Sequence, residues 1–243
     1  MDLKKDLRNI QLDYVPGTDY KIYQDRDSFS FGVDSIILSS FAKPKGVVFD
    51  LGTGNGIIPL RIVNKSEVEK IYGVEIQREV YELAKKSIEI NNLTDKIELI
   101  NEDINNLPSL FPKSCVDTII TNPPYMKLGN ALINESKNHA IARHEIYISL
   151  EKLIEIANYL LKPNGKIFMI HRPNRMVDVI YFMRHYKLEP KCLRMIKPKP
   201  SLSPNLFLVE GVKGGNRELK VLNELSVYDE DGKYTKELLE MYK

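Results

Sequence analysis

Short apolar segments alternate with amphipathic stretches along the middle of this chain of 243 residues. The apolar segments lie at residues 47–49, 71–74, 97–100, 116–120 and 166–170. Their length is typical of buried strands. Apolar residues with a helical period run from Val80 to Ile88, between the second and third segments, and from Leu150 to Leu161, before the fifth. This alternation predicts an α/β fold, in which helices cover both faces of a mostly parallel sheet.

The two ends of the chain break this alternation. Residues 20–24 predict a strand, and a short helix should follow that Asp34 can cap. Near the other end, residues 206–213 predict a late strand. Residues 228–243 are polar and finish in a short helical pattern.

Composition narrows the class of protein. Hydrophobic residues make up 43% of the chain and charged residues 28%, which is typical of a globular protein that buries most of its apolar surface. The charged N-terminus has no apolar segment of the kind found in secretory signals, and no apolar run approaches the ~18 residues of a membrane span. Two cysteines, Cys115 and Cys192, are too few for a disulfide framework or a zinc site. We therefore expect a cytoplasmic protein without a bound metal.

The first apolar segment continues into a glycine-rich loop that reads Asp50-Leu51-Gly52-Thr53-Gly54-Asn55-Gly56. Gly52, Gly54 and Gly56 allow the backbone to turn tightly and to pass close to a ligand. Their spacing differs from the dinucleotide-binding fingerprint. An acidic Asp50 at the strand end would repel a pyrophosphate and would favour an ammonium group. The loop therefore predicts a ligand that carries a positive charge at this point.

Two more acidic residues follow the next two predicted strands. Glu75 lies where α/β nucleotide-binding folds place the acid that binds ribose hydroxyls. Asp103 follows the third strand, where it could bind an adenine amino group. Ile76 and Ile104, beside these acids, belong to the same predicted site. S-adenosylmethionine combines an ammonium group, a ribose and an adenine without a phosphate, so it is the predicted cofactor.

Residues 122–125 read Asn-Pro-Pro-Tyr and directly follow the fourth apolar segment. The side-chain oxygen of Asn122 and the carbonyl oxygen of Pro123 can both accept hydrogen bonds from one planar amine. Pro123 has no N–H and a fixed φ, so the turn offers acceptors only. Tyr125 adds a flat face on which a ring can stack. We expect these three residues to be catalytic, by positioning an amine and not by acting as a base.

These features together resemble class I S-adenosylmethionine-dependent methyltransferases of the amino-methylating branch, over about residues 20–213. The resemblance implies a Rossmann-like sheet of seven strands, mostly parallel with a reversed last strand. It also implies an N-terminal extension and cofactor lid at 1–45, a catalytic domain at 46–213 and a C-terminal tail at 214–243 that packs on it. Members with this tetrapeptide methylate adenine N6, or the glutamine side chain of release factors. A relative with Phe in the fourth position methylates guanine N2 in ribosomal RNA.

Shorter blocks resemble the bacterial tRNA1(Val) adenine-37 N6-methyltransferases. They lie at residues 20–24, 29–38, 142–145, 171–173, 198–199 and 228–235. The resemblance implies cofactor contacts from Phe31 and Asp34, and substrate contacts from Arg143, His144 and Arg172. Gly32 departs from the pattern, because Ser or a similar residue is expected there. The implied partner is tRNA near its anticodon loop, the implied product of the cofactor is S-adenosylhomocysteine, and no obligate protein partner is implied.

A basic strip at residues 184–220 favours an RNA partner. It holds nine Lys or Arg and three Glu, whereas the net charge of the whole chain is +2. Clustered cations are typical of phosphate contacts, and we expect Lys197 and Lys199 to be among them. The alternative is an ordinary solvated face. The sequence also leaves open a protein glutamine N5-methyltransferase, a ribosomal RNA guanine or adenine N-methyltransferase, and a non-catalytic RNA-binding module.

Overall fold

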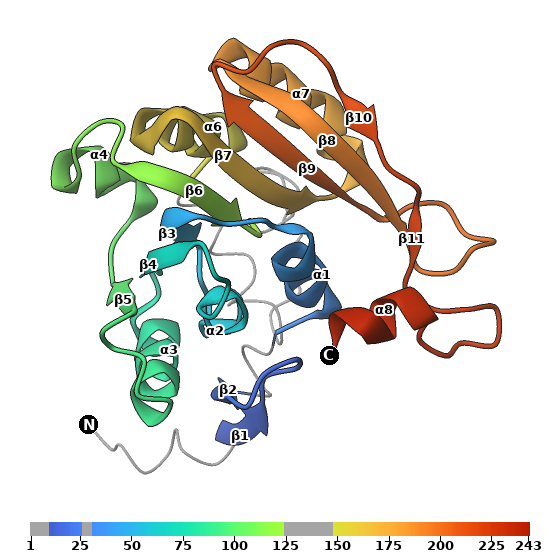
Figure 1. Ribbon diagram of the computed structural model, residues 1–243, viewed down its shortest axis with the longest axis horizontal. Coiled ribbons are helices and arrows are strands. Elements are labelled where there is room, and N and C mark those ends of the chain that lie inside the picture. Colours follow the sequence, from blue (N-terminus) through green and yellow to red (C-terminus); the bar gives the residue numbers. More distant parts are fainter. Residues whose placement is uncertain (1–9, 26–30, 124–147) are drawn as a thin grey trace, which may run out of the picture.

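A computed structural model describes residues 10–25, 31–123 and 148–243 (Figure 1). The strands are β1 (Ile10–Tyr14), β2 (Lys21–Asp25), β3 (Gly46–Leu51), β4 (Val68–Val74), β5 (Ile97–Ile100), β6 (Val116–Thr121), β7 (Leu161–His171), β8 (Leu188–Lys197), β9 (Leu206–Lys213), β10 (Lys220–Val221) and β11 (Leu225–Ser226). The α-helices are α1 (Val33–Phe41), α2 (Ile57–Ile62), α3 (Arg78–Ile90), α4 (Leu107–Leu110), α6 (Leu150–Leu160), α7 (Met176–His185) and α8 (Lys236–Met241). Two 3-10 turns are η1 (Ile104–Asn106) and η2 (Pro173–Arg175).

The central sheet confirms the predicted α/β, Rossmann-like architecture. Its long strands lie in the order β5-β4-β3-β6-β7-β9-β8, and the two-residue strands β10 and β11 both pair with β8 to complete a nine-stranded sheet. All long strands are parallel except β9, which is antiparallel to both β7 and β8. The reversed last strand expected at residues 206–213 is therefore present, inserted between two parallel neighbours.

The hydrophobic pattern did not reveal strand β8. Its pairing with β9 contains a register shift between Pro190 and Cys192, which interrupts the alternation of buried and exposed side chains. Its charged residues were counted in the basic strip. A strand with a bulge and a charged outer face lacks the period-two pattern by which strands are recognised in a sequence.

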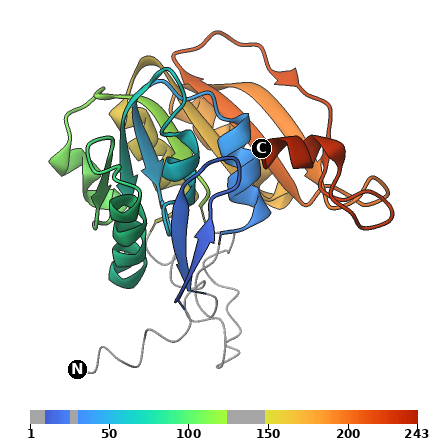
Figure 2. The ribbon, with the colours of Figure 1, turned by 60° about the horizontal axis from the view of Figure 1, so that its bottom comes forward.

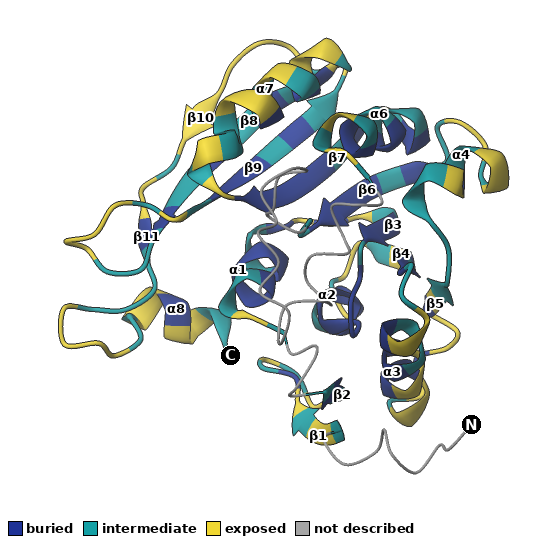
Figure 3. Cartoon of the chain, turned by 180° about the vertical axis from the view of Figure 1, so that it is seen from behind, coloured by how far each residue is buried: buried dark blue, intermediate teal, exposed yellow. Residues whose placement is uncertain are grey.

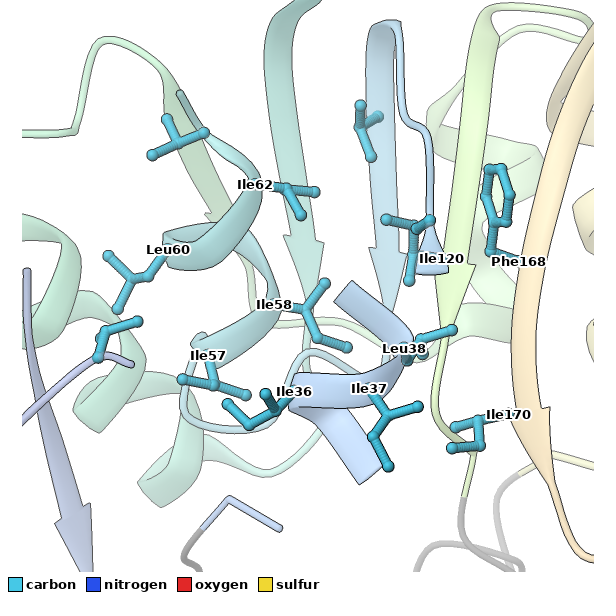
Figure 4. Close-up of a cluster of buried hydrophobic side chains, with 14 of the residues drawn as sticks. Ile36, Ile37, Leu38, Ile57, Ile58, Leu60, Ile62, Ile120, Phe168 and Ile170 are labelled. Carbon is cyan, nitrogen blue, oxygen red and sulfur yellow. The ribbon is translucent and has the colours of Figure 1, made fainter. Parts of the chain in front are cut away.

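Two apolar layers cover the two faces of the sheet. Neighbouring residues of one strand belong to opposite layers, because successive side chains in a strand point to opposite faces: Ile120 packs with α1 and α2, whereas Ile119 packs with α6. Figure 4 shows the first layer, in which Ile36, Ile37, Leu38, Ile57, Ile58, Leu60, Ile120 and Phe168 converge. Figure 3 shows that β7 is mostly buried and that β9 is buried over its central part, as expected for central strands between two layers.

The hairpin of β1 and β2 lies against α3 (Figure 2). The backbone N–H of Tyr23 donates to Ser87 Oγ at 2.9 Å, and that of Lys21 donates to Asn91 Oδ1 at 2.9 Å. These bonds attach β2 of the N-terminal hairpin to α3, which packs beside the sheet.

The start of helix α1 differs from the prediction in the residue that occupies the N-cap position. Its N-cap is Gly32, and no side chain caps it, so the predicted cap by Asp34 is wrong. Asp34 instead lies in the first turn of the helix. A Cβ at position 32 would lie 2.6 Å from Asp34 Oδ1, so a larger residue there would displace this carboxylate. Because this carboxylate is the end of a flexible side chain, the contact alone does not require glycine at the position where the resemblance leads one to expect Ser.

Arg61 of α2 joins both ends of the chain to the core. Its guanidinium donates to Ser39 Oγ at 2.7 Å, to the Met241 carbonyl at 2.6 Å and to the Pro16 carbonyl. Burial lowers the pKa of Arg61. One cation thus fixes α1 between the N-terminal hairpin and α8, and α1 in turn borders the site described next.

Candidate active site

The acids and the asparagine predicted from the sequence meet at one edge of the sheet. The strands β5, β4, β3 and β6 are neighbours and parallel, so their carboxyl ends lie together. Asp50 is the penultimate residue of β3, and it pairs in register with Gly73 of β4 and Ile120 of β6. Ligands of such sheets bind outside this edge.

The glycine loop is tied to the neighbouring strand. The backbone N–H groups of Gly52 and Thr53 both donate to the Val74 carbonyl, at 3.0 and 2.9 Å. Gly52 has a φ of +76°, a conformation that L side chains rarely adopt. A Cβ on Gly52 would meet nothing within 4 Å, so its backbone faces open space. The loop therefore presents a rigid backbone edge to a ligand.

Asp50 and Asn55 carry buried polar atoms that the protein does not satisfy. Asp50 Oδ2 accepts a hydrogen bond from Thr53 Oγ1 at 2.6 Å, but Asp50 Oδ1 has no partner among the described residues. Both polar atoms of the Asn55 side chain are also buried without such a partner. Burial raises the pKa of Asp50 to about 7, and nearby Glu75 contributes to this rise, whereas the Thr53 hydrogen bond opposes it. A cationic ligand group would compensate the buried carboxylate.

A pocket beside the loop brings several predicted residues together. It is lined by Leu51, Gly52, Val74, Glu75, Ile76, Asp103, Ile104, Thr121, Pro123, Ile148 and Leu153. The Glu75 carboxylate accepts from the N–H groups of Gly54 at 3.0 Å and of Gln77 at 2.9 Å, and this fixes its position. Asp103 Oδ1 accepts from the backbone N–H of Asn105 at 2.8 Å. The pocket is thus an apolar slot with two oriented acids.

Ile76 and Ile104 of the pocket wall were predicted, but several of its other residues were not. Leu51, Thr121 and Leu153 belong to elements whose existence the hydrophobic pattern predicts. That pattern shows that a residue is buried, but it does not distinguish a core contact from the border of a cavity. Gly54 and Gly56 do not line the pocket; Gly56 is the N-cap of α2, with a φ of +87°.

Asn122 lies between Thr121 and Pro123, two residues that line this pocket. The hydroxyl of Thr121 donates to the Leu51 carbonyl at 2.9 Å, which links the end of β6 to the start of the glycine loop. The amide Nδ2 of Asn122 donates to Ser35 Oγ of α1 at 3.3 Å. Phe31 and Asp34 lie in the same segment as Ser35, and the Phe31 N–H donates to Gln24 Oε1 at 3.1 Å. The first turn of α1 therefore adjoins the predicted catalytic asparagine.

Only some of the predicted substrate-binding residues lie in the described part of the chain. Tyr125, Arg143 and His144 lie outside the described residues. Arg172 follows β7 at the same edge of the sheet as Asn122, and its N–H donates to His171 Nδ1 at 2.8 Å. Burial lowers the pKa of His171 to about 4, with Arg175 adding to the effect, so this histidine is neutral at pH 7.

The basic strip is more strongly compensated than its composition indicates. Lys197 forms an ion pair with Glu224 at 2.6 Å, and Arg194 forms one with Glu237 at 2.6 Å. Lys199 Nζ donates to the Glu230 carbonyl at 3.1 Å. These acidic residues lie beyond residue 220, so a count over the strip alone overstates its local charge. Lys197 and Lys199 still lie at or beyond the carboxyl end of β8, the edge that carries Asn122.

The family described as "Methyltransferase domain" matches residues 42–233, which is most of the chain. The chain belongs to this family. It is an S-adenosylmethionine-dependent methyltransferase, as the resemblance implied. Within the described residues of the methyltransferase, no helix could cross a bilayer, and no group of three or more His, Cys, Asp or Glu is arranged to hold a metal.

Relatives and solved structures agree with this assignment. A protein of Porphyromonas gingivalis named tRNA1(Val) (adenine(37)-N6)-methyltransferase is 29% identical over 199 residues, which cover 79% of this chain and 77% of that protein. A structure described as a predicted O-methyltransferase from Agrobacterium tumefaciens superposes with a TM-score of 0.68 at 19% identity, covering 86% of this chain and 94% of the other. Geranyl diphosphate C-methyltransferase of Streptomyces coelicolor, solved with S-adenosyl-L-homocysteine, superposes with a TM-score of 0.54 at 12% identity, covering 74% and 79%. The two superpositions confirm the fold.

The site of the methyltransferase fits its cofactor chemically. The buried, unpartnered Oδ1 of Asp50 matches an ammonium group, and the open space beside Gly52 admits a ligand against the loop. Glu75 offers an anionic acceptor for hydroxyl groups, and Ile76 and Ile104 offer apolar surface for a ring. The donors and acceptors present thus correspond to the parts of S-adenosylmethionine.

Proposed function

We propose that this methyltransferase methylates the exocyclic N6 amine of an adenine in tRNA, at position 37 of the anticodon loop. The observation that carries the proposal is the place of Asn122, beside the cofactor pocket and oriented by Ser35. The name of the relative from Porphyromonas gingivalis supports the choice of base and of RNA.

On the cofactor side, each residue would have a separate task. Asp50 would bind the ammonium group, Glu75 the ribose hydroxyls and Asp103 the adenine amino group, and the extension at 1–45 would cover them. When bound, S-adenosylmethionine supplies an electrophilic methyl group on a sulfonium centre. Because Glu75 and Asp103 are already held by backbone N–H groups, little reorganisation is needed when the ligand binds.

On the substrate side, Asn122 and Pro123 would orient the amine. The N6 lone pair of adenine is delocalised into the ring, which makes it a poor nucleophile. Two acceptors, Asn122 Oδ1 and the Pro123 carbonyl, would bind the two N6 hydrogens and hold the amine in a more tetrahedral geometry, so that the lone pair is less delocalised and points at the methyl group. The same acceptors stabilise the positive charge that develops on the nitrogen. The proton can then leave to water, so no side-chain base is needed.

The bond from Nδ2 of Asn122 to Ser35 supports this assignment. An asparagine amide has one donor end and one acceptor end. With Nδ2 directed to Ser35 Oγ, the amine would be met by Oδ1 and not by a second donor. The hydroxyl of Thr121 holds this arrangement against the glycine loop.

The RNA must present its base outside the stack. Extrusion of a base costs a few kcal/mol, and stacking on an aromatic ring such as Tyr125 returns roughly 1–3 kcal/mol. Arg143, His144, Arg172, Lys197 and Lys199 are the proposed contacts to the rest of the nucleic acid. Arg172 follows β7, Lys197 is the last residue of β8 and Lys199 follows β8, all at the edge that carries Asn122.

The test is methyl transfer from labelled S-adenosylmethionine to a purified tRNA pool and, in parallel, to a release factor. Nucleoside mass spectrometry of the tRNA should yield N6-methyladenosine. Label found only in the protein would assign the site to glutamine and would overturn the proposal. A methylated guanine would likewise overturn the choice of adenine.

A further inference from the structure

A groove lies along α7, between this helix, the start of β8 and the residues that follow β9. The residues that matter for its chemistry are Tyr181, Arg184, His185, Lys187, Glu189 and Arg217. Figure 3 shows that the outer surface of α7 is largely exposed. The groove contains none of the residues assigned to the cofactor or to the target amine.

The groove has an excess of positive charge. Three permanent cations, Arg184, Lys187 and Arg217, are opposed by one acid, Glu189, which contacts Arg184 at 3.3 Å. Lys187 and Arg217 are exposed, and their side chains have no hydrogen-bond or ion-pair partner within the described parts of the chain. This distinguishes them from Lys197 and Arg194 of the same strip, which are paired with acids.

The groove also presents aromatic surface to solvent. Tyr181 is 61% exposed, and its ring is stacked on His185, with a centroid distance of 6.0 Å and an interplanar angle of 20°. Val177, in the same groove, is 76% exposed. Exposed rings between unpaired cations are a combination that suits nucleic acid, since cations meet phosphates and rings meet bases or sugars.

The groove and the methyl-transfer site lie at opposite edges of the sheet. Lys187 precedes the amino end of β8, whereas Lys197 is its last residue, and β8 runs parallel to β7. At about 3.3 Å per residue, the ten residues of β8 span ~30 Å.

We propose that this groove binds the phosphate backbone of the tRNA substrate, roughly 30 Å from the methylated base. The inference rests on the proposed function for its choice of RNA. It assigns a role to Lys187 and Arg217, which line the groove at the edge of the sheet opposite to Asn122. The methyltransferase would then hold its substrate at two separated places, the target loop and a helical region of the same molecule.

The test compares two RNAs and two matched double variants of the full chain. Lys187→Gln/Arg217→Gln removes two charges from the groove. Lys85→Gln/Lys86→Gln removes two exposed charges from α3, which flanks the opposite side of the sheet. The RNAs are full-length tRNA and a hairpin that carries the target loop on only four base pairs, a stem much shorter than the ~30 Å length of β8. Fluorescence anisotropy over a salt series gives the affinity of each pair.

The groove variant should bind full-length tRNA about tenfold more weakly, and its plot of log affinity against log salt should be shallower by about 1.5 to 2. Its affinity for the hairpin, and the affinities of the α3 variant, should equal those of the unmodified protein. Unchanged binding of full-length tRNA would overturn the proposal. The groove would then be a candidate binding surface for a protein partner. An equal loss on both RNAs would also overturn it, because the groove would then lie within reach of the loop.

The proposed function is judged by a separate readout. Methylation of the hairpin by the unmodified protein depends on the Asn122 site alone. If the hairpin and full-length tRNA bind but no N6-methyladenosine forms, the proposed function fails while the binding comparison still decides on the groove.

Discussion

The proposed cofactor side of the sheet, at Asp50 and Glu75, and the proposed RNA side, at Lys197 and Lys199, differ most in how their charged groups are held. Asp50 and Glu75 are buried, and Glu75 is fixed by two backbone N–H groups. Lys197 and Lys199 are partly exposed, and they interact with residues of the C-terminal segment. Buried groups with fixed partners are preorganised for one ligand, whereas surface cations can adjust to a large and variable one. Substitutions should therefore have large and specific effects on the first side and small, salt-dependent effects on the second.

The largest effect is expected at the junction of the two sides. Asn122→Ala should lower turnover by roughly 10²–10³, which is typical of the loss of one preorganised hydrogen-bonding group in an active site. Its affinity for S-adenosylmethionine, measured by calorimetry, should stay within about twofold. Asn122→Asp keeps an acceptor at this position and should retain more activity than the alanine variant. Turnover of Asn122→Ala within tenfold of the unmodified protein would refute the assigned role.

The next effect concerns the cofactor alone. Asp50→Asn preserves the shape of the side chain and removes its charge. Charge-assisted hydrogen bonds contribute about 1.5–3 kcal/mol, so the dissociation constant of S-adenosylmethionine should rise about 10- to 100-fold. Calorimetry measures this directly, with S-adenosylhomocysteine as a second ligand that carries the same ammonium group. Equal affinities for the variant and the unmodified protein would show that Asp50 does not bind this group.

In the protein without cofactor, the buried carboxyl group of Asp50 should make the free energy of unfolding depend on pH. Burial raises the pKa of Asp50 to about 7, above the ordinary value of 3.8 expected in the unfolded chain. Between these values the unfolded chain releases a proton that the folded protein keeps, so stability falls as pH rises from about 4 to 7. The slope contributed by one group is at most about 1.4 kcal/mol per pH unit. Denaturant unfolding of Asp50→Asn should lack this contribution; an identical pH profile would contradict the buried, protonated carboxyl.

The cofactor side was predictable from the sequence because its residues follow a topological rule. Parallel neighbouring strands bring their carboxyl ends together, so Asp50, Glu75 and Asp103 could be assigned to one site before the structure was known. The contact of Ser35 with Asn122 joins residues far apart in the chain and depends on how α1 packs on the sheet. Nothing in the local pattern around either residue indicates it.

The RNA side was less predictable for a related reason. Its cations are obvious in the sequence, but their partners Glu224 and Glu237 come from a later segment that folds back on β8. A count of charges within a window cannot include partners outside it. Only the tertiary structure separates paired cations such as Lys197 from unpaired ones such as Lys187 and Arg217.

A smaller effect is expected for Ser35→Ala, which removes the partner of Asn122 Nδ2. A hydrogen bond of this kind contributes about 0.5–1.5 kcal/mol, so turnover should fall about 2- to 12-fold while the KM for the cofactor stays unchanged. Ser35→Thr keeps the hydroxyl and should restore most of the activity. In the Asn122→Ala background, Ser35→Ala should have no further effect on turnover. An equal loss in both backgrounds would show that Ser35 acts on folding or on another residue.

The smallest effect is expected at Lys197. Because Lys197 is paired with Glu224, substitution of either partner should change tRNA affinity, in opposite directions. Lys197→Gln should weaken tRNA binding about threefold and reduce the salt slope by about 1, because one phosphate contact is lost. Glu224→Gln should strengthen binding by a similar factor, because it releases the same ammonium group at 2.6 Å. Partly exposed ion pairs contribute only about 0–1 kcal/mol to stability, so both variants should unfold like the unmodified protein. If neither variant alters tRNA affinity, Lys197 serves only to hold the C-terminal segment on β8, and the RNA contacts at this edge must come from other residues.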